Sequence, residues 1–417
     1  MAEQKERNVN AGLLTIILPG ILIAATGVGA GDLATASFAG SHLGTGILWA
    51  VIIGSIFKFV LTEGLARWQL ATGKTFLEGM AAYVGPVFGC LFLPYLLLWT
   101  FFVGSALMSA CGVTLHAIFP VFADASQAKI VFGITCSLLG LVMVLIGGFR
   151  LFEKIMAACI ALMFVTVLLT AAILWPGVGE VAQGLVIPKI PDAEGQGMTW
   201  TVALIGGVGG TLTILCYGYW IREKGRNSVD DIRVCRIDLS VGYLLTAIFG
   251  VAMVIIGSTV ELEGKGAGLL VALADKLQEP LGATGRWIFL VGAFGAVFSS
   301  LLGVWQAVPY LFADFWRLFF RQTESSVIDV SAWPYRVYLF AIALLPMLGL
   351  LMSFQEVQKL YAIIGAAFLP LLAIALLFLN GRRAWVAGYI NRWLSISLLV
   401  VMIVFFGGMA VTKWFVL

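Results

Sequence analysis

The chain has 417 residues, of which 61% are apolar and only 11% are Asp, Glu, Lys or Arg, and its net charge is +3. A soluble domain carries roughly a quarter of charged residues, so the composition excludes a water-soluble globule, a disordered chain and a disulfide scaffold, and the small net charge indicates no nucleic-acid partner. Apolar runs of about 20 residues recur, which predicts an all-α polytopic membrane protein rather than a β-barrel with its short alternating segments.

Eleven membrane spans are predicted, with no soluble domain between them, so residues 1–417 are interpreted as one transmembrane domain. The ninth span is short, and the longest connections are about 175–198 and 259–284. In chain order the spans are 12–38, 44–68, 86–118, 128–147, 150–174, 199–221, 237–258, 285–315, 336–352, 357–379 and 393–415.

The distribution of Lys and Arg predicts the orientation. With the N-terminus in the cytoplasm, most basic residues fall on the cytoplasmic side, among them the charge run at 222–236. The positive-inside rule then favours a cytoplasmic N-terminus and an external C-terminus, consistent with an odd number of spans. A bacterial-type inner (plasma) membrane is the expected location.

Clustered glycine interrupts two spans in mid-membrane, at 27–31 in the first and 206–210 in the sixth. Each Gly weakens a helix interior by up to about 1 kcal/mol relative to Ala. The two positions are equivalent if spans 1–5 (about 12–174) and 6–10 (about 199–380) are inverted repeats followed by an extra helix. Paired broken helices indicate the central site of a transporter; close helix packing through small residues is the alternative.

Asp32 follows the first glycine cluster. A carboxylate in mid-membrane costs at least ~2.5–3.5 kcal/mol even on insertion scales, so something must compensate for it. We predict a cation ligand, assisted by freed carbonyls near Gly29 and Ala30. The alternative is an N-cap of the second half of the broken helix.

The sixth span would face Asp32 with oxygen ligands. These are the hydroxyls of Thr211 and Thr213 and the carbonyls of Gly207 and its neighbours. An all-oxygen set suits Mg²⁺, Mn²⁺ or Ca²⁺. The alternative for each Thr is a hydrogen bond within its own helix.

Lys58 lies well inside the second span, with Glu63 and Arg67 nearer the cytoplasmic end. Glu63 and Arg67 are four residues apart and are expected to pair. Lys58 could extend toward the membrane surface, pair with an acidic residue such as Glu63, or approach the central site, where its ammonium could replace a coupling cation or titrate during transport.

Other polar residues in the spans carry weaker signals. Gln306 and Asp314 could line an inner vestibule, with a solvated helix end favoured for Asp314, and Tyr217 and Tyr219 are expected to be packing or interface residues. The six cysteines form no C-x-x-C pair and are expected to be inert. No nucleophile–base set, phosphate loop or His/Cys metal spacing is present, so neither an enzyme nor a cofactor is predicted.

Several of these residues resemble the Nramp family of divalent-metal transporters. Gly29-Ala30-Gly31-Asp32-Leu33-Ala34-Thr35 is similar to the first span of that family, where D-P-G-N-x-A-T is usual. The resemblance covers nearly the whole chain in span count and order, and implies a LeuT-like fold of 5+5 inverted repeats with broken helices 1 and 6. Further similar segments are Leu18-Pro19-Gly20, 64–73, Gly148-Phe149-Arg150 with Glu153, Ser299-Ser300 and Leu369-Pro370.

The departures from the family pattern are as informative as the matches. The family's metal-binding Asp falls on Gly29, its Pro on Ala30 and its Asn on Asp32. Its M-P-H-N of span six falls on Thr211-Leu212-Thr213-Ile214, so the soft Met ligand and the His are absent. The resemblance therefore implies a divergent member, and the lost thioether favours hard cations.

Three functions remain open. The leading hypothesis is a secondary transporter of a divalent cation such as Mg²⁺ or Mn²⁺ that works by alternating access, with Asp32 and Thr211 as metal ligands and protons as a candidate coupling ion. The second is a transporter of the same fold for a small organic solute such as an amino acid, and the third is a non-transporting sensor or scaffold. The lipid bilayer and the transported ion are the expected partners, and no obligate protein partner is evident.

Overall fold

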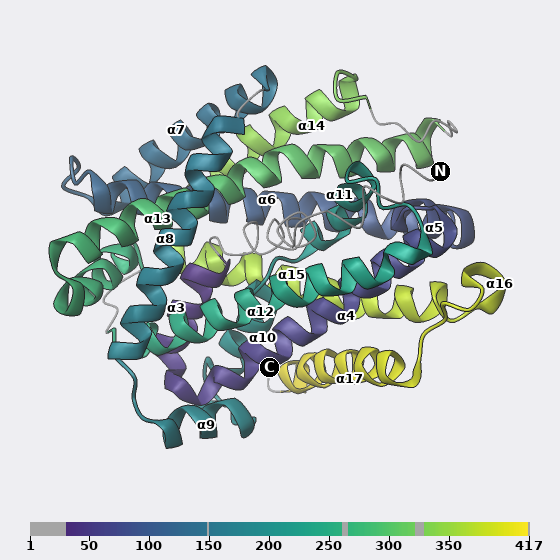
Figure 1. The fold of residues 1–417 in the computed structure, drawn as a ribbon. Coiled ribbons are helices and arrows are strands. Elements are labelled where there is room, and N and C mark those ends of the chain that lie inside the picture. Colours follow the sequence, from purple (N-terminus) through teal and green to yellow (C-terminus); the bar gives the residue numbers. More distant parts are fainter. Residues whose placement is uncertain (1–30, 148–149, 261–265, 322–328, 416–417) are drawn as a thin grey trace, which may run out of the picture.

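The structure, a computed structural model, describes residues 31–147, 150–260, 266–321 and 329–415. Every regular element in these residues is a helix (Figure 1). The longer helices are α4 (Leu48–Thr72), α6 (Pro86–Ile118), α7 (Ala125–Ile146), α8 (Arg150–Ile173), α12 (Ile232–Gly257), α13 (Leu269–Trp316), α15 (Phe354–Leu379) and α17 (Trp393–Phe415). The shorter helices are α3 (Ala36–Leu43), α5 (Phe76–Tyr83), α9 (Val178–Val186), α10 (Gly197–Gly207), α11 (Tyr217–Glu223), α14 (Trp333–Leu344) and α16 (Arg383–Val386). Short π or 3₁₀ turns are η1 (Gly31–Thr35), η2 (Gly44–Ile47), η3 (Leu212–Cys216), η4 (Val229–Asp231), η5 (Arg317–Arg321) and η6 (Leu345–Leu351).

The helices agree with the predicted spans from the second onward. In the described residues, nine helical stretches are long and apolar enough to cross a membrane, or ten if Ile160–Ile173 and Val178–Val186, bent by 114°, form one span. The first predicted span begins before residue 31, so the count of eleven stays a prediction. Both long connections contain helix: α9 lies in the first, and α13 extends back to Leu269 across a kink at Gly282 (φ 65°).

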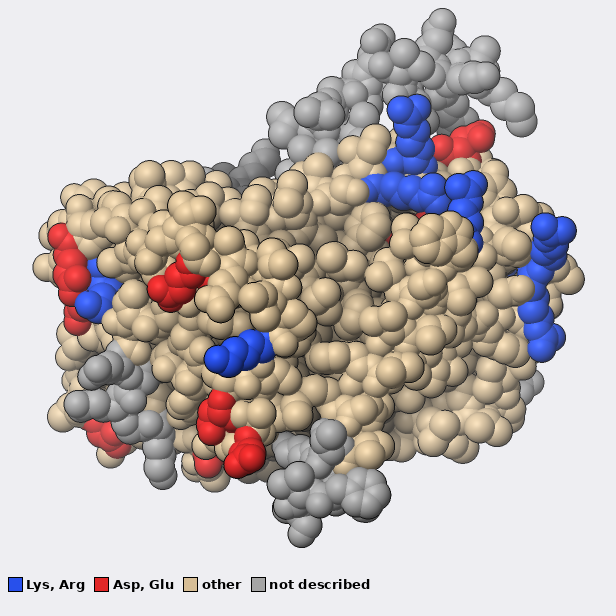
Figure 2. Space-filling view, turned by 90° about the horizontal axis from the view of Figure 1, so that it is seen from below, with Lys and Arg blue, Asp and Glu red and all other residues tan. Residues whose placement is uncertain are grey.

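The outside of the bundle is apolar. Helix α7 exposes Val131, Leu138, Leu139, Val142 and Leu145, whereas soluble monomers rarely expose large contiguous apolar patches. On the face in Figure 2, most of the Lys and Arg gather toward the right, the end at which α5 and α16 lie in Figure 1, and a wide uncharged surface separates these from most of the Asp and Glu. This surface and the apolar helices make the chain an integral membrane protein.

The helices pack in two groups. Helices α10 and α12 each pack on α3 and α4, while α6, α7, α13 and α14 contact one another; α8 and α15 contact members of both groups. The turn η1 packs on α10, α12 and α15, while η3 packs on α13 and α4. The interruption of the sixth span therefore lies between the groups, where a small relative movement of the groups would change its surroundings.

Close approach of α6 and α7 depends on small residues. A methyl group on Gly112 would lie 2.2 Å from the carbonyl oxygen of Lys129, and one on Gly133 would lie 2.8 Å from that of Met108. Because both obstacles are backbone atoms, they cannot move aside as a flexible side chain would. Such small-residue contacts are a usual way for helices to associate in membranes.

Replacing Gly112 by Ala is expected to destabilise the protein by about 1–3 kcal/mol, the usual cost of overpacking. The readout is the apparent melting temperature of the purified protein in detergent. Gly407→Ala on α17 is the matched control, because a methyl group there meets nothing within 4 Å and adds helix propensity. Equal melting temperatures for the two variants would contradict the packing argument.

Candidate functional site

The sixth span is broken at residues 208–211, which we call the unwound segment. Helix α10 ends at Gly207, and helical structure resumes as η3 and then α11. Gly209 and Gly210 have φ values of 75° and 77°, a left-handed conformation that side-chain-bearing residues rarely adopt. The predicted interruption of this span is therefore present. The glycine cluster of the first span, with Gly29 and Ala30, lies outside the described residues.

Asp32 faces the unwound segment from the first predicted span. It lies in η1 with no exposed surface, and both of its carboxylate oxygens accept from the Gly209 N–H at 3.2 Å. The approach is possible because the backbones are bare: a methyl group on Gly31 would lie 2.3 Å from the Gly207 carbonyl oxygen. The two glycine-containing turns thus place a buried carboxylate against free backbone groups.

Lys58 reaches the same segment from α4. It is fully buried, and its Nζ donates to the carbonyl oxygens of Gly206, at 2.8 Å, and Val208. Of the three positions that the sequence left open, the structure thus places this ammonium beside the unwound segment of the sixth span. Asp32 and Lys58, both in the described part of the chain, do not form a direct ion pair; they meet through the backbone of the unwound segment.

Several hydroxyl groups also lie near the unwound segment. Thr211 is buried, accepts from Trp99 Nε1 at 2.8 Å and also forms a hydrogen bond with the Tyr361 hydroxyl, while Thr213 is half-buried in η3. Thr35 and Thr246 have buried hydroxyls with no hydrogen-bond partner in the described part of the chain. A methyl group on Gly207 would lie 3.2 Å from Thr35 Oγ1, and one on Gly209 3.2 Å from Thr246 Cγ2.

Thr35 and Thr246 lie near the unwound segment but were not among the residues predicted for the site. Thr35 follows Asp32 by three residues, which places both on one face of a helix, so its position was a readable signal. Thr246 belongs to α12 and meets the site only through tertiary packing. Buried hydroxyls without partners are uncommon and call for an explanation, and an ion or water held at this site would supply one.

The metal-binding chemistry available here is oxygen-based. Over residues 31–147, 150–260, 266–321 and 329–415, no group of three or more His, Cys, Asp or Glu side chains is placed to hold a metal ion. A cation at the unwound segment would therefore bind Asp32 together with hydroxyls, carbonyls and its own water. Magnesium keeps several waters in this way and uses only one or two carboxylates.

The gating candidates Glu63 and Arg67 lie at one end of the bundle. We call it the Arg-rich end, because it also contains Arg222, Arg226, Arg236 and Arg317. Glu63 pairs with Arg67 (3.3 Å), as the i,i+4 spacing predicts, and with Arg236 (2.7 Å). Arg67 also donates to Asn391 Oδ1 at 2.8 Å and to the carbonyl of Tyr389 at 3.1 Å. These contacts hold α4 to α12 and to the segment after α16.

The prediction of a solvated helix end for Asp314 is wrong. The residue is only 1% exposed, because Tyr219 donates to it at 2.6 Å and Arg317 pairs with it at 2.7 Å. Arg317 also pairs with Glu78 (3.0 Å), which lies 3.8 Å from Arg222. This chain of charges joins α5, α11 and α13 at the Arg-rich end.

The structure does not bring Gln306 into the site. Its side chain is exposed, whereas Asp32, Lys58 and Thr211 are buried. Its backbone carbonyl accepts from the Tyr335 hydroxyl at 3.3 Å.

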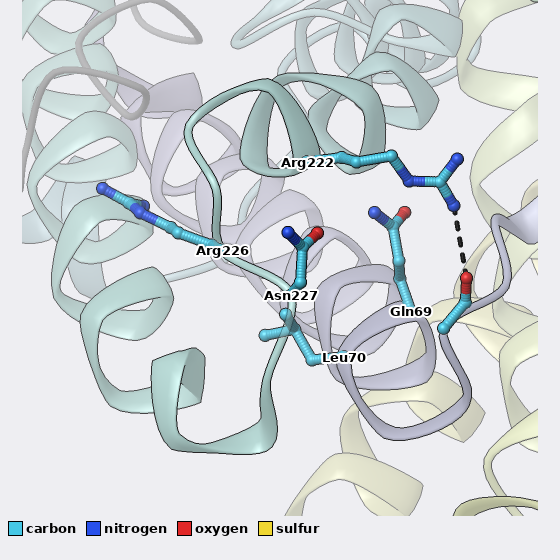
Figure 3. A pocket seen from close by; sticks show the side chains of 6 residues that line it. Gln69, Leu70, Arg222, Arg226 and Asn227 are labelled. Atoms are coloured by element: carbon cyan, nitrogen blue, oxygen red, sulfur yellow. Dashed lines mark hydrogen bonds between the residues drawn. The ribbon is translucent and has the colours of Figure 1, made fainter. Parts of the chain in front are cut away.

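A pocket of about 230 Å³ opens at the Arg-rich end (Figure 3). Arg222 donates to the Gly73 carbonyl at 3.2 Å across it, and the Arg226 side chain points away from Arg222. The lining of this pocket contains no residue of the unwound segment, and its arginines disfavour a cation. Its lining consists of Gln69, Leu70, Gly73, Arg222, Arg226 and Asn227.

Comparisons with known proteins agree with this architecture. Two crystal structures of mutants of the Eremococcus coleocola manganese transporter are similar to it at 17% identity, covering 94% of this chain and 86% of theirs, with TM-scores of 0.68 and 0.70. MhsT in complex with L-phenylalanine is 15% identical, over 97% of this chain and 98% of that one, with a TM-score of 0.62. At these identities the likeness shows the fold alone.

Sequence comparison identifies the family as well as the fold. An uncharacterized protein of Pasteurella multocida is 22% identical over 336 residues, which is 78% of this chain and 76% of that protein. The family model described as natural resistance-associated macrophage protein-like matches residues 20–415. Because that match covers nearly the whole chain, the protein belongs to the Nramp family.

Proposed function

We propose that the chain is a secondary transporter of divalent metal cations that works by alternating access. The observation that carries the proposal is Asp32, a fully buried carboxylate held against the unwound segment of a broken helix. A mid-membrane carboxylate is a functional-site hypothesis by default, and interrupted helices hold the ions of many transporters. Membership of the Nramp family and the likeness to a structure named as a manganese transporter support the same proposal.

The ligands proposed for the ion are all hard oxygen donors. Asp32 supplies the charge, Thr211 and Thr213 supply hydroxyl oxygens, and Gly207 supplies a carbonyl; Gly29 and Ala30 are proposed ligands on the other broken span. Oxygen ligands without thioether or imidazole suit Mg²⁺ or Mn²⁺ better than softer metals. The hydroxyls of Thr35 and Thr246, which have no partner in the described residues, are within the same region and would bind waters of the hydrated ion.

We also propose an orientation of the chain in the membrane and a coupling of transport to protons. The Arg-rich end would face the cytoplasm of a bacterial-type inner membrane, as the positive-inside rule favours. Its charge chain from Asp314 to Arg222 would close the cytoplasmic side, with Glu63 and Arg67 as part of the closure. Proton coupling is tested by imposing a pH gradient in the uptake assay below.

Uptake into proteoliposomes tests the proposal directly. Liposomes that contain the purified protein are expected to accumulate Mn²⁺, and Mg²⁺ in competition with it, faster than protein-free liposomes. Cd²⁺, which prefers softer ligands, should compete poorly. Uptake rates equal to those of protein-free liposomes for every divalent ion would refute metal transport.

One observation favours a second candidate, the transport of a small organic solute such as an amino acid. Lys58 and Asp32 contact one unwound segment, so their formal charges cancel, which suits a zwitterionic cargo better than a bare dication. A thermal-shift screen of divalent metals against amino acids separates the two candidates. Stabilisation by amino acids alone would reverse the order proposed here.

A further inference from the structure

The carboxyl end of α10 has the features of a cation site. The last carbonyls of a helix lack intrahelical donors and carry the negative end of the helix dipole. At this end the chain turns away through Gly209 and Gly210, so the carbonyls of Gly206 and Val208 converge on one point. That point is occupied by the ammonium of Lys58.

The ammonium of Lys58 cannot reach water at either membrane surface. By the rise of an α-helix, it lies roughly 15 Å from the first residue of α4 and roughly 21 Å from the last, too far for a lysine side chain to reach either membrane surface. Its whole side chain is buried. A lone ammonium buried in this way would be very costly, so the two carbonyls and the nearby carboxylate of Asp32 account for its presence.

A single peptide group joins Lys58 to Asp32. The carbonyl of Val208 accepts from Lys58, and the N–H of Gly209, which belongs to the same peptide bond, donates to Asp32 at 3.2 Å. Hydrogen bonds in series polarise one another, so the ammonium strengthens the bond that positions the carboxylate. The ammonium and the carboxylate are thus coupled through the backbone.

We propose that Lys58 is a tethered cation that fills a cation subsite made by the carbonyl oxygens of Gly206 and Val208. The residue thereby determines cation specificity: a free cation reaches this subsite only when the ammonium withdraws. Truncating Lys58 opens the subsite to small cations of the same chemistry, such as methylammonium, and exposes a divalent ion at Asp32 to two more carbonyl oxygens.

The first test uses no metal. Purified Lys58→Ala is melted in detergent with increasing methylammonium chloride, and with tetramethylammonium chloride at equal ionic strength as the size control. Methylammonium should raise the apparent melting temperature of Lys58→Ala saturably, by at least about 2 °C, and leave the native chain unchanged. Lys129→Ala is the matched control, because Lys129 is also buried and also donates to a carbonyl, that of Met352. No saturable rise, or an equal rise in Lys129→Ala, would overturn the proposal.

The second test rests on the proposed function and uses Lys58→Met, which keeps most of the side-chain volume if the Ala variant does not fold. Removing the ammonium should tighten Mn²⁺ binding by at least about tenfold, measured by calorimetry against the native chain and Lys129→Met. Unchanged or weaker binding would overturn the tethered cation. Tighter binding without any Mn²⁺ uptake by the native chain would support the tethered cation and refute metal transport, so the two failures are distinguishable.

Discussion

Replacing Asp32 by Asn is expected to reduce Mn²⁺ uptake into proteoliposomes at least about 100-fold. The estimate is conservative, because even groups that only orient metal ligands cost 10–100-fold when they are removed. Asn keeps the shape of the side chain and removes the charge, so the loss would report the charge of the carboxylate. Initial uptake rates at several Mn²⁺ concentrations separate weakened binding from slowed transport.

The control for Asp32→Asn is Asp275→Asn. Asp275 is exposed on α13 and pairs with Arg286, so its replacement should leave uptake unchanged. Asp32→Glu retains the charge and should retain part of the activity. Equal rates for the native chain and Asp32→Asn would remove Asp32 from the mechanism, provided that both elute as folded protein in size-exclusion chromatography.

Arg226→Met should destabilise the protein by about 3–5 kcal/mol, the usual result of removing one partner of a buried ion pair. Asp238 has no exposed surface and accepts from Tyr217 at 2.9 Å, while Arg226 pairs with it at 3.0 Å. Removing the guanidinium leaves a buried carboxylate without that positive charge. The pair joins α12 to the loop after α11, so its loss should also loosen the Arg-rich end.

Arg236→Met is the matched control for this effect. The Arg236 side chain is 51% exposed, and its partner Glu63 keeps a second salt bridge to Arg67. An exposed pair is worth up to about 1 kcal/mol, so Arg236→Met should lower the apparent melting temperature far less than Arg226→Met. Similar losses in both variants would show that the burial of Asp238 does not matter to stability.

The fold was predictable to the extent that it depends on local properties of the chain. The length of each apolar run defines a membrane span, and the glycines at 209 and 210 permit the positive φ values that break the sixth one. The i,i+4 spacing likewise predicts the Glu63–Arg67 pair. Each of these features depends on residues that are close together in the chain.

The arrangement of the site was less predictable, because it depends on residues from distant elements. Asp314 is buried because Tyr219, on a different helix, donates to it, and no property of its own span indicates this. Thr246 meets the unwound segment only because α12 packs there. The sequence could name Lys58 as anomalous, but the direction of its side chain depends on the position of α10.

The peptide between Val208 and Gly209 has a consequence for the evolution of this branch of the family. It couples Asp32 and Lys58, so losing either residue alone leaves an uncompensated charge in the membrane interior. Substitutions at these two positions should therefore be correlated among related chains: relatives with a neutral residue at one position should be neutral at the other. A relative with a second acidic residue near Asp32 would need further positive charge there, so the charges at these positions would divide the relatives by the charge of the ion that they accept.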